Sequence, residues 1–135
     1  VVTLPDDMPP EAVCLLACGV ITGIGAVINA GKMRPGDDVV VIGAGGVGLN
    51  AIQGARIGGA RRIVAVDMSE EKLEIARGFG ATDGILAPRN NPWEAAHAAL
   101  GRGADVVAVE NVRETTCAVM QQTLMRIVGR ADVFG

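Results

Sequence analysis

A run of apolar residues followed by a glycine pattern constrains the fold more than any other part of the sequence. Residues 39–42 are Val-Val-Val-Ile, and such a β-branched run is typical of a strand buried on both faces of a parallel sheet. Gly43, Gly45 and Gly48 follow with the spacing G-x-G-x-x-G, and apolar residues then recur at roughly helical spacing as far as Gly58. This order predicts a strand, a tight turn and a helix, which is the structural context of a dinucleotide-binding fingerprint.

Each glycine of the pattern has its own physical task. Gly43 permits the tight turn, Gly45 lets a pyrophosphate approach the backbone, and Gly48 lets the helix pack closely on the strand. The N–H groups of a helix that begins near Gly46 would face the phosphates. Asp67 ends the next apolar run, nineteen residues after Gly48, where a ribose-binding carboxylate belongs. The alternative is an ordinary glycine-rich turn between a strand and a helix.

Composition restricts the class of protein. The chain has 135 residues, of which 50% are hydrophobic and 20% charged, as expected for one globular domain. The net charge is −3 without a basic stripe, so we expect no nucleic-acid partner. We find no export signal and no unbroken run of about eighteen apolar residues, so we expect no membrane association. Three cysteines without a C-x-x-C pair favour a reducing compartment, and we predict a cytoplasmic protein.

The alternation of strands and helices predicts the fold class. Two short helices, over residues 12–17 and 22–30, are expected before the central strand, with a break at Cys18-Gly19, and the first is expected to be buried because it is apolar almost throughout. The rest predicts an α/β fold, a doubly wound parallel (Rossmann) sheet of about five strands in the order 3-2-1-4-5. The expected strands are 39–42, 63–66, 83–87, 105–109 and 130–134, and the helices between them are 46–57, 69–79, 92–100 and 115–125. Ser69 is the expected N-cap of the second of these helices, with two acidic residues in its first turn.

Four stretches of the chain resemble a known family. Residues 16–26, 41–51, 65–67 and 79–83 resemble, in order and spacing, the zinc-dependent alcohol dehydrogenases of the medium-chain dehydrogenase/reductase superfamily. Within that superfamily the chain is most similar to the bacterial nicotinoprotein and formaldehyde-type branch. The resemblance implies an NAD-binding Rossmann domain over residues 1–135, with lead-in helices from a missing catalytic domain in 1–35 and the nucleotide-binding core in 36–135.

The resemblance also implies roles for individual residues. Cys18 matches one of the three protein ligands of a catalytic zinc, which in this class are two cysteines and one histidine. Thr22 matches a residue beside the nicotinamide, whereas Asp67 and Lys72 match contacts to the adenosine ribose. No catalytic side chain is expected in this chain. The residues that match the pyrophosphate turn are Gly43, Gly45, Gly46, Val47 and Gly48.

Two departures from the family pattern bear on activity. The other two zinc ligands and the four-cysteine lobe for a structural zinc precede this segment in the family and do not occur here. Residues 110–113 stand where the family usually has a glycine, which leaves the contacts of that loop to the nicotinamide open. Because the chain begins at Val1 and stops at Gly135, we expect it to be part of a longer protein, and we expect the 135 residues alone to be inactive.

Several residues have simpler interpretations. Taken alone, Cys18 would be a small buried hydrophobic residue, and only its matching neighbours favour a zinc ligand. Cys14 and Cys117 occupy apolar helical positions and are expected to pack in the interior. His97, the only histidine, is expected to lie at the surface or in packing rather than in a catalytic site. Arg61-Arg62 is expected at the edge of the sheet opposite the cleft, in contact with solvent.

Three functions from different classes fit these observations. The first is the NAD-binding domain of a zinc-dependent alcohol dehydrogenase, which in the intact enzyme transfers hydride between an alcohol or an aldehyde adduct and nicotinamide. The second is a stand-alone NAD(H)-binding or sensing module, and the third is a nucleotide-domain enzyme that uses S-adenosylmethionine. A homo-oligomer is expected, paired through the edge at residues 130–134 or the apolar face of 12–30. Asp67 next to the uncharged Met68 predicts NAD(H) rather than NADP(H).

Overall fold

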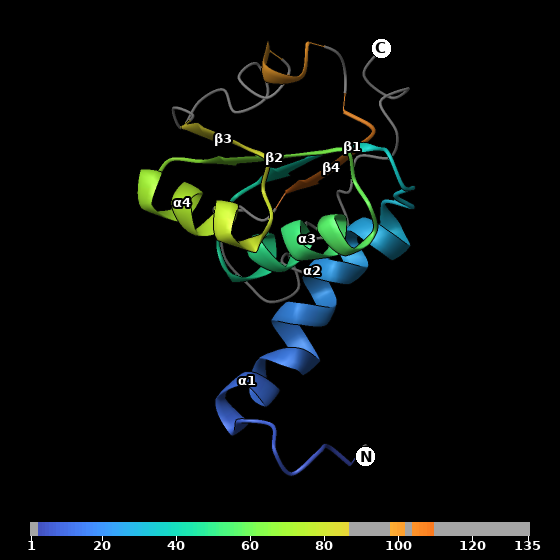
Figure 1. The fold of residues 1–135 in the computed structure, drawn as a ribbon, viewed down its shortest axis with the longest axis vertical. Coiled ribbons are helices and arrows are strands. Elements are labelled where there is room, and N and C mark those ends of the chain that lie inside the picture. The colour runs from blue at the N-terminus through green and yellow to red at the C-terminus, as the bar shows by residue number, and fades with distance from the viewer. Residues whose placement is uncertain (1–2, 87–97, 102–103, 110–135) are drawn as a thin grey trace, which may run out of the picture.

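The computed structural model describes residues 3–86, 98–101 and 104–109 (Figure 1). In this part of the chain a four-stranded parallel sheet has the order β3-β2-β1-β4, which confirms the predicted order of the first four strands. The predicted fifth strand at 130–134, the helix at 115–125 and most of the helix at 92–100 lie outside the described residues. The bounds are β1 Asp38–Ile42, β2 Arg62–Asp67, β3 Asp83–Leu86, β4 Val106–Val109, α3 Gly46–Ile57 and α4 Glu70–Phe79.

Strand β1 lies at the centre of the described sheet. It pairs with β2 on one side and with β4 on the other, and all five of its residues are buried. Val39 and Val41 pack in the cluster that includes α3 and α4, whereas Val40 and Ile42 pack on the other face with Leu100. Burial on both faces explains why residues 39–42 of this strand are continuously apolar rather than alternating.

Helices α3 and α4 both lie on one face of the sheet (Figure 1). Helix α3 runs from Gly46 to Ile57, as the sequence predicts, and buries Ala51, Ile52 and Ala55. Helix α4 begins after Ser69, whose hydroxyl oxygen accepts a hydrogen bond from the backbone N–H of Lys72 at 3.4 Å. The predicted N-cap is therefore present. The two acidic residues in the first turn stabilise the helix further, because their negative charges lie near the positive end of its dipole.

The two predicted lead-in helices form one continuous helix, from Pro10 to Ala30. Segments α1 (Pro10–Leu15) and α2 (Ile21–Gly25) are each followed by a π-helical turn, η1 (Leu16–Val20) and η2 (Ala26–Ala30). The predicted break at Cys18-Gly19 is therefore wrong. A single glycine inside a helix costs only about 1 kcal/mol relative to alanine, and the wider turn η1 accommodates it without ending the helix.

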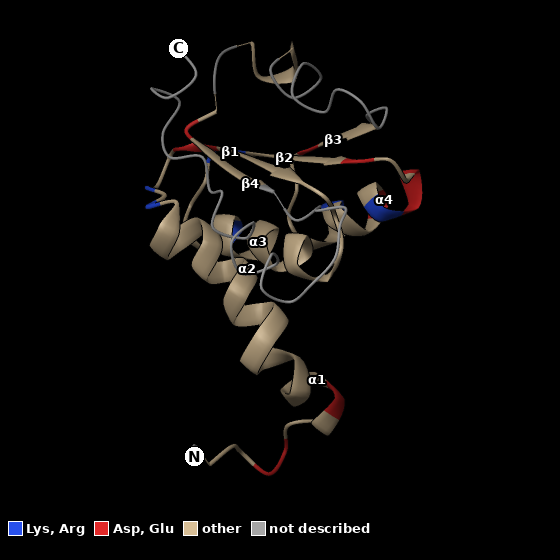
Figure 2. Ribbon diagram, turned by 180° about the vertical axis from the view of Figure 1, so that it is seen from behind, with Lys and Arg blue, Asp and Glu red and all other residues tan. Residues whose placement is uncertain are grey.

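The first half of this helix is exposed, contrary to the prediction of a buried helix. Leu15 is 60% exposed and Ile21 is 65% exposed. Figure 1 shows α1 projecting away from the sheet, and Figure 2 shows acidic but no basic residues near its start. Among the described residues, Pro10–Ala30 is the one helix long and apolar enough to cross a membrane, a test of length and composition that core helices of other proteins also pass.

The second half of the helix packs on α3 at backbone distance. Gly23 is buried, and a Cβ atom there would lie 2.4 Å from the carbonyl oxygen of Val47 and 2.7 Å from the backbone nitrogen of Ala51. On the other helix, a Cβ at Gly54 would lie 3.0 Å from the Cα of Ile24. The two glycines thus allow the lead-in helix to touch the helix that comes after the glycine turn.

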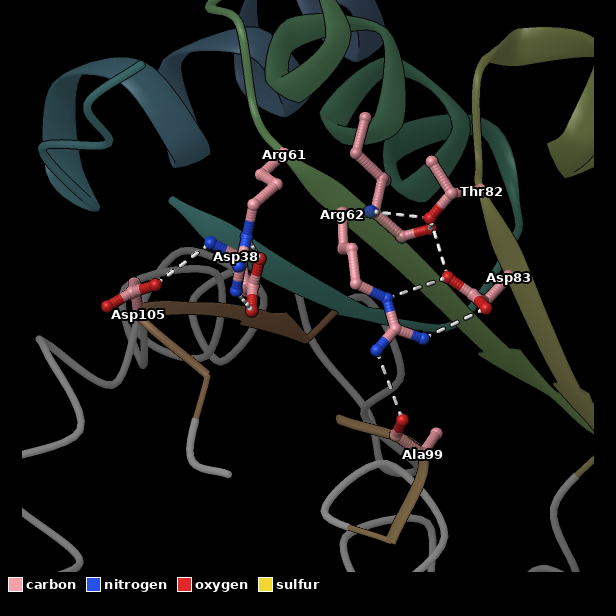
Figure 3. A network of polar contacts seen from close by, with 8 residues as sticks. Asp38, Arg61, Arg62, Thr82, Asp83, Ala99 and Asp105 are labelled. Atoms are coloured by element: carbon pink, nitrogen blue, oxygen red, sulfur yellow. Dashed lines mark hydrogen bonds and ion pairs between the residues drawn. The ribbon is translucent and has the colours of Figure 1, made fainter. Parts of the chain in front are cut away.

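Ion pairs lie at the end of the sheet where β1, β2 and β3 begin (Figure 3). Asp38 is only 1% exposed, and both of its carboxylate oxygens accept hydrogen bonds from Arg61, at 2.9 and 2.7 Å. Arg62 donates to both carboxylate oxygens of Asp83, at 3.2 and 3.0 Å, and also to the carbonyl oxygen of Ala99. The position predicted for the two arginines is confirmed, but both are ion-paired and not merely solvated.

The glycine contact between α2 and α3 predicts opposite effects for two alanine substitutions in the same helix. Gly23→Ala forces a methyl group into backbone atoms of α3 and should lower the free energy of unfolding by about 1–3 kcal/mol. Gly19→Ala, one turn earlier, meets no atom within 4 Å and should raise it by up to about 1 kcal/mol through helix propensity. Urea unfolding of both variants measures this, and equal effects would contradict the described packing.

The ion pair of Asp83 predicts a pH dependence of stability. Hydrogen bonds from Arg62 and Thr82 hold the pKa of the Asp83 carboxyl below its usual 3.8. The stabilisation is therefore present above the ordinary pKa of an aspartate and is lost as the pH falls through the lower folded value. Asp83→Asn should be less stable than the wild type near neutral pH, and the difference should shrink in acid. Urea unfolding at several pH values tests this, and a difference independent of pH would contradict it.

Candidate nucleotide-binding site

The register of the two central strands brings the glycine turn and Asp67 together. Ile42 of β1 pairs with Val66 of β2, so the chain leaves both strands at the same level. The backbone N–H of Gly43 then donates to the carbonyl oxygen of Val66 at 2.8 Å, which continues the ladder one residue beyond β1. Asp67 and the start of the turn therefore face each other at the carboxyl edge of the sheet, where open α/β sheets bind their ligands.

The backbone of the turn supports the tasks predicted for its glycines. Gly43 has φ of 97°, a value that side chains with a Cβ rarely adopt, so this position favours glycine. Gly45 is extended and precedes the first turn of α3. Gly46 is exposed, and a Cβ there would meet no atom within 4 Å, whereas Gly48 is buried. The turn thus presents an open backbone surface at the positive end of a twelve-residue helix, where anions bind.

The Asp67 carboxylate connects two turns. Its Oδ2 accepts a hydrogen bond from the backbone N–H of Ala44 at 2.8 Å, and its Oδ1 accepts one from the N–H of Ser69 at 3.0 Å. A carboxylate has about four acceptor positions, and two of those of Asp67 are occupied by these donors from the described residues. The structure therefore brings Asp67 to the glycine turn with its side chain fixed by backbone donors.

Two further residues flank this carboxylate. Met68 comes directly after Asp67 and is 50% exposed, so it offers an apolar surface without charge. Lys72 lies in the first turn of α4 and is exposed, and its backbone N–H is the donor to the Ser69 hydroxyl. Lys72 thus belongs to the first turn of the helix that follows Asp67 and Ser69.

Thr22 and Cys18 lie on the lead-in helix, which packs on the first turns of α3, directly after the glycine turn. Thr22 is half-buried and precedes Gly23, the residue in contact with Val47 and Ala51 of α3. Cys18, one turn earlier, is exposed and has a free thiol. The described residues contain no group of three side chains able to hold a metal ion. In chemical type and exposure Cys18 fits one ligand of a Cys₂His zinc site, and the described part of the chain supplies no complete site.

The structure also shows contacts that the sequence does not predict. The backbone donors of Ala44 and Ser69 that fix Asp67 carry no signal of their own in the sequence. The side chain of Asn50 donates to the carbonyl oxygen of Gly46 at 2.7 Å, an i to i+4 contact that the spacing of these two residues could have indicated. The expectation for Cys14 is wrong, since this thiol is exposed and does not pack in the core. Cys117 and His97 lie outside the described residues.

Comparison with known proteins agrees with this geometry. The family model for the zinc-binding dehydrogenases matches residues 46–135, which begin at the first residue of α3. The chain belongs to the zinc-binding dehydrogenase family. Membership in a dehydrogenase family also disfavours the alternative of an enzyme that uses S-adenosylmethionine.

Curated relatives share part of the chain at high identity. An S-(hydroxymethyl)glutathione dehydrogenase of Escherichia coli O1:K1 is 59% identical over 75 residues, which are 56% of this chain and 20% of that protein. A class-3 alcohol dehydrogenase of Myxine glutinosa is 51% identical over 80 residues, or 59% of this chain and 21% of that protein. The matched part of the chain thus spans about a fifth of the length of these relatives.

Solved structures of the family share the fold across nearly the whole chain. Benzyl alcohol dehydrogenase from Acinetobacter calcoaceticus matches with a TM-score of 0.75 and 34% identity, over 93% of this chain and 34% of that one. The alcohol dehydrogenase of Thermus sp. ATN1 matches with a TM-score of 0.69 and 35% identity, over 92% and 36%. The Rossmann-like fold of the family therefore applies to this chain.

Proposed function

We propose that this chain is the NAD(H)-binding domain of a zinc-dependent alcohol dehydrogenase, in which hydride passes between an alcohol or an aldehyde adduct and nicotinamide. The observation that carries the proposal is the Asp67 carboxylate at the glycine turn, in a chain of the zinc-binding dehydrogenase family. The relatives named for alcohols and for S-(hydroxymethyl)glutathione support an alcohol or an aldehyde adduct as the substrate class.

The residues of this chain bind and orient the dinucleotide in this proposal. The pyrophosphate lies over the turn from Gly43 to Gly48, where α3 begins. The Asp67 carboxylate accepts hydrogen bonds from the ribose hydroxyls, with Lys72 beside it. Thr22 borders the nicotinamide, because its helix lies on the first turns of α3. Residues 36–135 form the core of the domain, and residues 1–35 connect it to the rest of a longer protein.

The proposed role of Cys18 is to hold one position of a zinc ion. When bound, zinc would supply Lewis-acid polarisation of the alcohol oxygen, and NAD would supply the carbon that accepts the hydride. Cys18 lies five residues before Gly23, so the packing of α2 on α3 sets its position relative to the pyrophosphate turn. The chain's own contribution is thus to hold the dinucleotide and one zinc-ligating thiolate in a fixed relation.

The proposal extends to location and association. The enzyme is proposed to be cytoplasmic and homo-oligomeric and to bind neither nucleic acid nor membranes. The acidic net charge of the chain and the small-molecule substrates in the relatives' names support this. The exposed apolar residues of Pro10–Ala30 support a helix that is covered by other protein in the longer enzyme.

The charge at Asp67 predicts a preference for NAD(H) over NADP(H). A 2′-phosphate would bring about two negative charges close to the carboxylate, and among the described residues only Lys72 follows closely enough in the chain to neutralise them. This repulsion costs on the order of 2–4 kcal/mol after screening, or about a hundredfold in affinity. Isothermal titration with both cofactors measures the ratio, and equal affinities would show that Asp67 does not contact the ribose.

Two variants distinguish the effect of the Asp67 carboxylate from the effect of the net charge of the chain. Asp67→Ala should weaken NAD binding and narrow the gap to NADP, and it should also destabilise the turns that the carboxylate connects. Glu71→Ala removes the same charge from the exposed first turn of α4 and should leave the ratio unchanged. A ratio that shifts equally in both variants would mean that net charge alone sets the preference.

A second prediction concerns activity of the 135 residues by themselves. We expect no zinc-dependent oxidation of ethanol or S-(hydroxymethyl)glutathione, because a tetrahedral zinc needs three protein ligands and the described residues contain no such group. Formation of NADH, followed by its absorbance with added zinc, is the measurement. Turnover that requires zinc would overturn the assignment of this chain as a cofactor domain, whereas NAD binding without turnover is the expected result.

A further inference from the structure

An asparagine side chain is bound to the backbone at the start of α3. Asn50 is half-buried, and its amide nitrogen donates a hydrogen bond at 2.7 Å to the carbonyl oxygen of Gly46, the first residue of the helix. In a regular α-helix this carbonyl also accepts the backbone N–H four residues later, and a carbonyl oxygen has two acceptor positions. The Asn50 side chain therefore adds a second hydrogen bond to a peptide group of the glycine turn.

The sequence gives the start of α3 little stiffness of its own. Three of the four residues 45–48 are glycine, which has more backbone freedom than any other residue. Gly46 is exposed, and a Cβ atom there would meet no atom within 4 Å. The N-cap residue is Gly45, which has no side chain to accept a hydrogen bond from the first turn. A donor that restrains the carbonyl of Gly46 therefore acts where the helix is least restrained by its own residues.

This hydrogen bond stabilises the first turn through a carbonyl group. A serine, threonine or aspartate at the N-cap would instead accept hydrogen bonds from N–H groups at the helix start, the groups through which helices bind anions. Because a peptide group is planar, holding the carbonyl of Gly46 orients the whole peptide between Gly46 and Val47. Asn50 thus orients the turn from the side opposite to the one that faces an anion.

The lead-in helix confines the same side chain. A Cβ atom at Gly23 would lie 2.6 Å from the Cβ of Asn50, so the backbone of the lead-in helix lies directly against the base of this side chain. Close packing at a Cβ atom limits the rotamers that a side chain can adopt. The Asn50 side chain is therefore held at its base by packing and at its tip by the hydrogen bond to Gly46.

We propose that Asn50 is a positioning residue for the dinucleotide, whose amide holds the peptide between Gly46 and Val47 in the orientation that receives the pyrophosphate. The proposal rests on the proposed NAD(H)-binding function and adds to it a residue outside the glycine pattern. Asn50 acts through the backbone of the turn. A single hydrogen bond changes an equilibrium by a factor of about three to ten, and loss of the amide should weaken NAD binding by that factor.

The test is isothermal titration of NAD into the 135-residue chain and its variants, with urea unfolding of the same proteins. Asn50→Ala removes the donor but introduces a better helix former, so NAD affinity should fall about threefold to tenfold without a matching loss of stability. Asn50→Leu keeps a side chain of similar shape without a donor and should lose the same affinity. Asn50→Ser can donate to the carbonyl four residues earlier and should lose about twofold at most.

The matched control is Gln53→Ala, which removes a half-buried amide from the next turn of α3 and should bind NAD as the wild type does. The ratio of NAD to NADP affinity should stay unchanged in Asn50→Ala, because this variant leaves the Asp67 carboxylate in place. A change of that ratio would locate the effect at the ribose and overturn the positioning role.

The remaining results separate this proposal from the function on which it rests. If the wild type binds NAD and both Asn50→Ala and Asn50→Leu bind it equally well, the positioning role is overturned and the proposed function stands. An equal loss in Asn50→Ser or in Gln53→Ala would also overturn the role, because the effect would then not depend on a donor at this position. Absence of NAD binding by the wild type would overturn the proposed function itself.

Discussion

The parallel register of β1 and β2 is the constraint on which the site depends. Because Ile42 pairs with Val66, the turn after β1 and the carboxylate at the end of β2 emerge at the same level. The N–H of Ala44 can then reach Asp67, and the same carboxylate holds the start of the next turn. A slip of one residue would send the Asp67 side chain to the opposite face of the sheet and separate it from the glycine turn.

The parts that the sequence predicts correctly are those whose signals are local. The β-branched run of β1 and the glycine spacing after it specify a strand, a turn and the start of α3 within twenty residues. Ser69 with two acidic residues behind it marks the start of α4. Since parallel strands joined by right-handed crossovers leave few topologies, these local elements also determine the order of the first four strands.

The parts that it does not predict depend on contacts between distant residues. A glycine such as Gly19 is compatible both with the end of a helix and with its continuation, and here the wider turn η1 continues the helix. The buried carboxylate of Asp38 gains its partner Arg61 only after β1 and β2 have paired. Cys14 has apolar neighbours in the sequence and yet is exposed. An apolar sequence shows that a helix is hydrophobic, but it does not show which of its faces other elements cover.

The contact of Gly23 with α3 fixes the lead-in helix near its middle, and the outer part of the helix extends away from this contact. Cys18 lies five residues from this fixed point, or about 8 Å along the axis, whereas Pro10 lies more than twice as far away. A given angular fluctuation of the helix therefore displaces Cys18 less than it displaces Pro10. The spacing between the Cys18 thiol and the glycine turn is thus set by a single interhelical distance, and bending of the outer part of the helix hardly changes that spacing.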